Sequence, residues 1–258
     1  MKRFFLPGPV AVGSTAILTG DDAHHILRVL RMRRGEAVVL FDGNGVEYSA
    51  RIDRIHPDSV QVTVLERFFS SVESPIELTV AQGFLKEKKM DSLIRQLTEI
   101  GVSRWIPFFA GRSVSRPDAR RLATRTERWN KIAREALKQC RRVKAPVITE
   151  TLSFEEVLTS SAQSELKLIF WEDESLPLTQ VPQPSGRSPD GVFIMLGPEG
   201  GFSSHEVAQA RRHGFVSVSL GPRILRAETA AVAASVLAQF LFGDMGGCNT
   251  SGIHGRSI

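Results

Sequence analysis

The first 70 residues show the two-residue alternation of apolar and polar side chains that is typical of short β-strands. The Asp-Gly-Asn-Gly run at 42–45 predicts a hairpin turn. One helix interrupts the strands and carries Ile26, Leu27 and Leu30, and we expect Asp21 or Asp22 to cap its N-terminus. This region therefore resembles a small β-barrel. Its predicted strands span residues 16–19, 38–41, 46–55 and 60–67.

A Ser-rich stretch at 70–75 has the composition of a linker, and the pattern beyond it changes to strands alternating with helices. A strand at 76–83 precedes a helix whose apolar residues recur at helical spacing and which ends at Gly101. This alternation predicts a largely parallel α/β sheet. A Pro/Ser/Gly loop at 180–191 and a Gly/Asn/Ser-rich tail from 243, expected to be disordered, complete the chain. Further strands are predicted at 104–109, 166–171, 192–196 and 216–220.

Composition is that of an ordinary globular protein, since 42% of the 258 residues are hydrophobic and 24% are charged. No apolar run is long enough to cross a membrane, and Pro7-Gly8-Pro9 interrupts the apolar start before it reaches the length of a signal peptide. Cys140 and Cys248 lie far apart, which argues against a disulfide framework and a cysteine-based zinc site. These features favour the cytoplasm.

The net charge is +5, and most of the positive excess lies between Lys86 and Lys144. Within this belt, Arg121, Arg125 and Arg128 recur at one-turn spacing opposite an apolar stripe, so one helix has a buried face and a basic flank. A solvated helix face is the simpler interpretation, but the density of cations favours a nucleic acid partner whose binding depends on salt. Composition does not distinguish RNA from DNA.

A buried strand, a glycine turn and a helix follow one another at 192–206. Ser203 and Glu206 have the spacing of a capping box, and the three glycines allow a ligand to approach the backbone. An ordinary tight turn explains the pattern equally well. The chain has neither of the glycine motifs that bind nucleotide phosphates, and Glu199 adds negative charge, so a ligand with positive charge fits better.

A second turn, at 220–226, leads from a strand into a helix rich in small residues. We expect Val232, Val236 and Phe240 to form the buried face of this closing helix. Burial of the helix does not explain the charges at the turn, because charged groups need partners or water. A cleft is therefore expected there. The charged residues are Arg223, Arg226 and Glu228.

The two turns contain the motifs Gly-Pro-Glu-Gly-Gly-Phe-Ser at 197–203 and Leu-Gly-Pro-Arg-Ile-Leu-Arg-Ala-Glu-Thr-Ala at 220–230. Together they resemble the signature pair of the bacterial 16S ribosomal RNA uridine-N3 methyltransferases of the RsmE type, in the SPOUT superfamily. The runs at 24–31, 41–43, 97–102 and 135–140 agree with it, and the resemblance covers roughly residues 3–243. Ile100 and the run at 138–142 depart from the usual family pattern.

The resemblance implies an N-terminal PUA-like β-barrel (1–70), a linker (71–75), a C-terminal SPOUT α/β domain (76–243) with a deep trefoil knot, and a tail (244–258). It further implies a homodimer that uses S-adenosylmethionine to methylate N3 of a uridine in 16S ribosomal RNA of the small subunit. The implied cofactor contacts are Leu196, Gly197, Glu199, Gly200, Gly201, Leu220, Gly221, Ile224, Leu225, Arg226 and Thr229.

The chemistry requires N3 of the uracil to lose its proton, and our hypothesis gives the catalytic roles to Arg226 and Glu228. Arg226 would stabilise negative charge on the uracil carbonyls, and Glu228 would accept the proton or orient Arg226. A structural ion pair at the helix start is the alternative. No metal is expected, because His24 and His25 are adjacent on a helix and point in different directions. The expected RNA contacts are Arg28, Arg31, Arg33, Arg34, Arg112, Arg116, Arg128 and Arg141.

Two other functions remain open from the sequence. One is a SPOUT methyltransferase that acts on transfer RNA or on a ribose 2′-oxygen, although the His-His-x-x-x-Val-Leu-Arg stretch at 24–31 counts against it. The other is a ribosome-assembly factor that binds RNA without catalysis.

Overall fold

The computed structural model describes residues 2–69, 72–86, 88–114, 116–173, 175–181 and 187–247. The chain divides into two compact units with separate cores, one made of residues 1–73 and 137–145 and the other of residues 74–136 and 146–258. Residues 137–145 lie within the predicted 76–243 domain but belong to the first unit. Ser70 and Ser71 of the predicted linker, and residues 248–258 of the predicted tail, lie outside the described residues.

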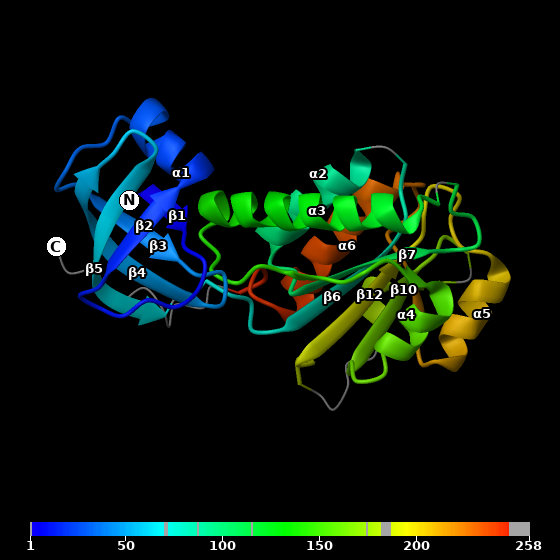
Figure 1. Cartoon of the computed structure of the whole chain (residues 1–258). Helices are drawn as coiled ribbons and strands as arrows, with labels where there is room; N and C mark the ends of the chain where they lie inside the picture. The colour runs from blue at the N-terminus through cyan, green and yellow to red at the C-terminus, as the bar shows by residue number, and fades with distance from the viewer. Residues whose placement is uncertain are drawn as a thin grey trace. The chain divides into compact units, whose positions relative to one another are not determined.

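The first unit contains a five-stranded sheet in the order β1-β3-β4-β5-β2 (Figure 1), in which β1 is parallel to β3 and the other neighbours are antiparallel. The four predicted strands are confirmed, whereas β1 was not predicted. Inward residues such as Leu40, Tyr48 and Val62 form its core. Its elements are β1 (Lys2–Phe5), β2 (Thr15–Thr19), α1 (Gly20–His24), the π-helix η1 (His25–Val29), β3 (Ala37–Phe41), β4 (Val46–Ile55) and β5 (Ser59–Phe69).

The predicted aspartate cap of the first helix is wrong. Thr19 is the N-cap, with extended backbone and no hydrogen bond from its side chain to the helix. Gly20, at φ 61°, turns the chain directly from β2 into the helix, so Asp21 and Asp22 lie in the first turn. There they stabilise the positive end of the helix dipole instead of capping it.

The predicted hairpin turn between β3 and β4 is confirmed. Asp42 Oδ1 accepts hydrogen bonds from the backbone N–H of Asn44 at 2.8 Å and of Val46 at 3.1 Å. The carboxylate therefore satisfies donors that the turn takes out of the β3–β4 ladder.

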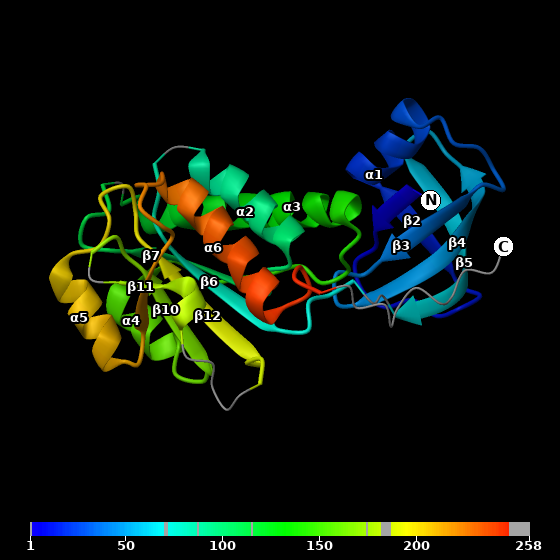
Figure 2. The same cartoon turned by 180° about the vertical axis from the view of Figure 1, so that it is seen from behind.

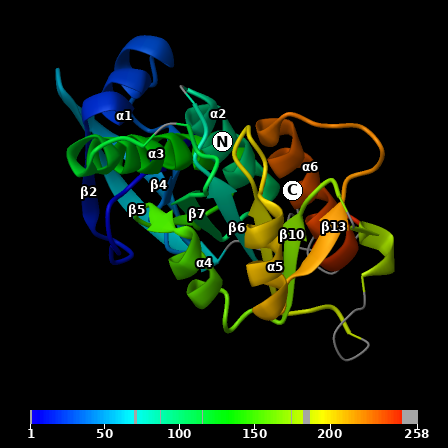
Figure 3. The same cartoon turned by 90° about the vertical axis from the view of Figure 1, so that its right-hand side faces the viewer.

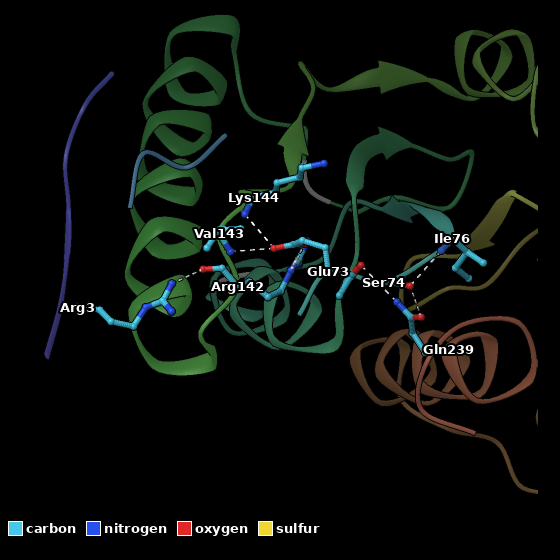
Figure 4. A network of polar contacts seen from close by, with 9 residues as sticks. Arg3, Glu73, Ser74, Ile76, Arg142, Val143, Lys144 and Gln239 are labelled. Atoms are coloured by element: carbon cyan, nitrogen blue, oxygen red, sulfur yellow. Dashed lines mark hydrogen bonds and ion pairs between the residues drawn. The ribbon is translucent and has the colours of Figure 1, made fainter. Parts of the chain in front are cut away.

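A buried ion pair joins residues 137–145 to the rest of the first unit (Figure 4). Arg142, only 5% exposed, contacts Glu73 at 3.0 Å, and Glu73 Oε1 accepts from the backbone N–H of Val143 and Lys144 at 2.8 and 3.0 Å. Arg3 donates to the Arg142 carbonyl oxygen at 3.0 Å. Because a buried charge that loses its partner costs several kcal/mol, about 3–5, the role of Arg142 is structural.

The second unit is built on a sheet of eight strands in which all paired strands are parallel, as predicted. The order along the sheet is β11-β13-β10-β12-β6-β7-β8, and β9 pairs with β7. Its elements are β6 (Glu77–Gly83), α2 (Lys89–Ile100), β7 (Arg104–Phe109), α3 (Ala119–Cys140, whose last four residues belong to the first unit), β8 (Val147–Ile148), β9 (Leu152–Ser153), α4 (Phe154–Ser160), β10 (Leu166–Phe170), β11 (Leu176–Pro177), η2 (Leu178–Gln180), β12 (Gly191–Leu196), α5 (Ser204–Arg212), β13 (Val216–Ser219) and α6 (Ala227–Phe242).

Helices cover both faces of this sheet. Figures 1 and 2 show α2, α3 and α6 on one face, and α4 and α5 on the other. The strands alternate accordingly: in β12, Val192 and Ile194 pack in the core under α2 and α6, while Phe193 and Met195 pack against α4 and α5. A strand buried on both faces reads as a continuous apolar run, which explains why these strands were predictable.

The predicted buried face of the last helix is wrong at Val236 and Phe240, whereas Val232 is partly buried and packs against the core. Ala231, Ala234 and Ala238 face the core, whereas Val236 is 37% and Phe240 is 56% exposed. Since α6 packs against α2, β6 and β12, these small side chains allow a close approach, and Val236, Leu237 and Phe240 are left exposed. Buried Gln239 donates to the Gly101 carbonyl oxygen at 3.3 Å and accepts from Ser74 Oγ at 2.8 Å, a contact visible in Figure 4.

Candidate functional site

Both glycine motifs lie at the same edge of the sheet. The strands β12, β10 and β13 are parallel neighbours, so the segments that follow them leave the sheet side by side. Figure 3 shows β13 beside β10 and the chain running from β13 to α6. We name residues 197–201 the first glycine loop and residues 220–226 the second loop. In open α/β sheets, ligands bind at the carboxyl ends of the strands.

A pocket opens where the second loop meets the end of β10. Trp171 and Glu172, which follow β10, were not predicted as site residues, although ligands of such sheets bind at the carboxyl ends of the strands and a strand was predicted at 166–171. Ile224 is 92% exposed at the pocket wall, so an apolar side chain is available to contact a ligand. The lining residues are Phe170, Trp171, Glu172, Val218, Ser219, Leu220, Gly221, Arg223, Ile224, Leu225 and Ala230.

The first glycine loop packs directly on the end of β6. A Cβ at Gly83 would lie 2.5 Å from the backbone nitrogen of Pro198, so only glycine permits this approach. Buried Gln82 donates from Nε2 to the Gly197 carbonyl oxygen at 2.9 Å. Gln82 and Gly83 were not predicted as site residues, because their proximity to the loop depends on the pairing of β6 with β12.

The first glycine loop is also held by Arg112, which is one of the predicted RNA contacts. Its Nη1 donates to the carbonyl oxygens of Gly200 at 3.1 Å and of Phe202 at 3.2 Å. The predicted capping box follows: Ser203 Oγ accepts from the Glu206 N–H, and Glu206 Oε2 accepts from the Ser203 N–H at 2.8 Å. The loop therefore enters α5 with its backbone fixed.

Glu199 does not present a free negative charge to a ligand. Its Oε1 accepts from the Lys86 backbone N–H at 3.0 Å and from Lys89 Nζ at 3.2 Å. Partial burial acts to raise the pKa of Glu199, but these hydrogen bonds outweigh it and hold that pKa below its usual value. The same hydrogen bond raises the pKa of Lys89. Glu199 is therefore ionised and paired.

The two candidate catalytic residues lie at the start of α6. Arg226 is the N-cap residue and its side chain is exposed, while Glu228 lies in the first turn. Glu228 Oε2 is shielded from solvent and forms an ion pair with Lys89 Nζ at 3.4 Å. Lys89 was not predicted as a site residue. Thr229, a predicted cofactor contact, is exposed in the same turn.

The predicted RNA contacts divide between the two units. In the second unit, Arg128 pairs with Asp91 at 2.7 Å and Arg116 lies over the Phe109 ring. Arg141, in the first unit, is exposed at φ 66°, a left-handed conformation that ends α3. The other predicted RNA contacts in the first unit are exposed on η1 and the loop after it: Arg28, Arg31, Arg33 and Arg34.

Within the described ranges, no group of three or more His, Cys, Asp or Glu side chains is arranged to hold a metal ion. In the same part of the chain, no helix combines the length and apolar character needed to span a bilayer.

Comparison with known proteins matches both units to RNA methyltransferases. A family described as "RNA methyltransferase domain" matches residues 72–239, and one described as "RNA methyltransferase PUA domain" matches residues 18–65. The chain is 32% identical over 240 residues to the ribosomal RNA small subunit methyltransferase E of Bacillus subtilis, covering 89% of this chain and 93% of that protein.

Two solved structures resemble the whole chain. The ribosomal RNA small subunit methyltransferase E of Neisseria gonorrhoeae, bound to S-adenosyl methionine, is 35% identical with a TM-score of 0.86, covering 95% of this chain and 99% of that one. A Legionella pneumophila protein in complex with the cofactor S-adenosylmethionine is 32% identical with a TM-score of 0.85, covering 94% and 98%.

Proposed function

Because the chain belongs to the family of the ribosomal RNA small subunit methyltransferases E, and thus methylates ribosomal RNA with S-adenosylmethionine as cofactor, we propose that its target is N3 of one uridine in 16S ribosomal RNA. The α/β unit is its methyltransferase domain, and the first unit contains its PUA-like domain. The observation that carries the proposal is that both signature motifs lie at one edge of the sheet, where Lys89 pairs with Glu199 of the first and Glu228 of the second.

The residues around the pocket fit the cofactor. The second loop offers the apolar side chains of Leu220, Ile224 and Leu225 to an adenosine group. In the first glycine loop, a Cβ at Gly197 would lie 3.2 Å from the Gly201 backbone, so glycine there permits the tight turn, and Gly201 has a positive φ of 66° that favours glycine. We propose that these loops hold S-adenosylmethionine through the predicted contacts. When bound, this cofactor supplies an activated methyl group on a sulfonium.

The proposed mechanism is an in-line displacement by uridine N3, in which positioning supplies much of the rate. Arg226, exposed at the start of α6, stabilises the negative charge that the uracil carbonyls develop as N3 loses its proton. Glu228 is the proposed proton acceptor or orienting group. Glu228 Oε2 lies 3.4 Å from Lys89 Nζ, which holds the carboxylate at the start of α6.

Exposed arginines are proposed to bind the RNA backbone. Arg28, Arg31, Arg33 and Arg34 provide four cations in a short stretch of the PUA-like domain, and Arg116 and Arg128 serve the methyltransferase domain. Such contacts release counterions, so RNA affinity should fall as salt increases.

Three further features remain proposals. A homodimer is supported by the exposed apolar side chains of α6, among them Val236, Leu237 and Phe240. A trefoil knot is supported by the strand order. In it, β13 lies between β11 and β10, and β12 lies between β10 and β6, so each is inserted between two strands that precede it in the chain. A cytoplasmic location within reach of the small ribosomal subunit follows from the substrate.

Mass spectrometry of ribosomal RNA from cells lacking the gene tests the target. A missing methyl group on a uracil base supports the proposal, a missing ribose methyl group indicates a 2′-oxygen enzyme, and unchanged RNA indicates a non-catalytic assembly factor.

A purified Arg226→Ala variant tests the catalytic assignment. We expect turnover to fall at least about a hundredfold with cofactor binding retained, since a removed charge-stabilising donor costs about 10²–10³ in rate. Unchanged turnover would remove Arg226 from the mechanism.

A further inference from the structure

Lys89 occupies a position where helix electrostatics disfavours a cation. It is the first residue of α2, at the end where the helix dipole is positive. A positive side chain at this end is destabilising unless negative groups compensate it. Among the described residues, two carboxylates from distant parts of the sequence lie within ion-pair distance of Lys89 Nζ.

These carboxylates belong to the two motifs that form the candidate site. Lys89 Nζ lies 3.2 Å from Glu199 Oε1 in the first glycine loop and 3.4 Å from Glu228 Oε2 in the first turn of α6. The side chains of Lys89, Glu199 and Glu228 are only 33%, 25% and 26% exposed. Without the ammonium, two partly buried carboxylates would repel each other across the gap between the motifs.

We propose that Lys89 is a positioning residue for the methyl-transfer site, whose ammonium fixes the first glycine loop relative to the start of α6. Both motifs must be in place at once for the cofactor to be held, and Arg226 is only two residues from Glu228 in the sequence. Lys89 therefore controls cofactor affinity without contacting the cofactor. The proposal rests on the proposed function, since it assigns both motifs to cofactor binding.

An exposed ion pair typically contributes little to stability, so the effect of Lys89 depends on how its charge partners are arranged. A local surface pair joins residues close in sequence, as Arg121 joins Asp118 at three-residue spacing. Lys89 instead connects three segments, and its partner Glu199 also accepts a backbone N–H from Lys86. The first glycine loop is therefore held through Glu199 by two groups, the Lys86 backbone N–H and the Lys89 ammonium.

The test compares Lys89→Met with Lys89→Arg, which keeps the cation, and with Lys88→Met, which removes the neighbouring charge. Calorimetry measures S-adenosylmethionine affinity without RNA, and steady-state kinetics measures KM and kcat. We expect Lys89→Met to weaken affinity and raise KM about tenfold, the effect of losing a hydrogen bond to a charged group. Saturating kcat should change much less, since uniform binding is what is lost. Lys89→Arg should restore most of the affinity, and Lys88→Met should match the parent.

A double-mutant cycle separates positioning from general destabilisation. In the parent, the effects of Glu199→Gln and Glu228→Gln on affinity should be non-additive, because both act through one ammonium, and in Lys89→Met they should become additive. Parent-like affinity in Lys89→Met, or additive effects in the parent, would overturn the proposal. If the parent itself binds no S-adenosylmethionine, the proposed function fails instead.

Discussion

Substituting alanine for Gly83 should weaken cofactor binding, although this residue lies in β6 and outside both motifs. The added Cβ would lie 2.5 Å from the Pro198 nitrogen and 2.8 Å from the Gly197 carbonyl carbon. These are backbone atoms, so no side-chain rotation relieves the overlap. Either β6 or the first glycine loop must move. Overpacking of this kind costs about 1–3 kcal/mol.

If the first glycine loop moves, this free energy appears as lost affinity for S-adenosylmethionine, because the loop must return to its position in the parent protein when the cofactor binds. A cost of about 1–3 kcal/mol corresponds to a loss between about fivefold and about 150-fold. Isothermal titration of S-adenosylmethionine against the Gly83→Ala variant measures this loss, and thermal unfolding shows whether the strain is instead expressed in stability.

Gly191→Ala is the matched control, at the start of the neighbouring strand β12. Its Cβ would meet only the Ser164 Cα at 3.9 Å, an ordinary van der Waals distance. This variant should bind the cofactor like the parent. If Gly83→Ala also keeps parent affinity and parent stability, then the packing of the loop on β6 has been misinterpreted.

Two further variants test the role of Arg112 at the first glycine loop and the role of the exposed apolar face of α6. Arg112→Met should reduce S-adenosylmethionine affinity about tenfold without RNA present, because its guanidinium holds two carbonyl oxygens of the loop region; normal cofactor affinity with weakened RNA binding would return Arg112 to the role predicted from sequence. Phe240→Glu should halve the molar mass measured by light scattering, because a charge on the exposed apolar face of α6 opposes self-association. An unchanged mass would place the dimer contact elsewhere or exclude it.

Several features were predictable because they depend on neighbours in sequence. The strand at 46–55 was predicted with its observed bounds, and Gly101 ends α2 with a left-handed φ of 98°. The Ser203–Glu206 capping box is likewise local, since both partners lie within one helical turn. Periodicity, turn residues and caps are written in consecutive residues, so a single sequence records them.

Other predictions failed where a contact outside the segment decided the outcome. The buried face of α6 could not be predicted by size, because the close approach of α2 and the sheet selects Ala234 over Val236. The aspartate cap failed for a local reason instead, because Gly20, at φ 61°, starts the helix one residue before Asp21. The structural role of Arg142 was not predicted, because it depends on Glu73, which lies 69 residues away in sequence.

The sequence by itself determined the parallel α/β class, the two glycine-bearing motifs and the family to which they belong. Only the tertiary structure decided that Gln82, Gly83 and Lys89 support these motifs, and that Glu199 is already paired. The physical reason is that a parallel sheet is ordered in space differently from the chain, so strands distant in sequence become neighbours at their carboxyl ends. Side chains that meet there carry no local pattern that announces their partners.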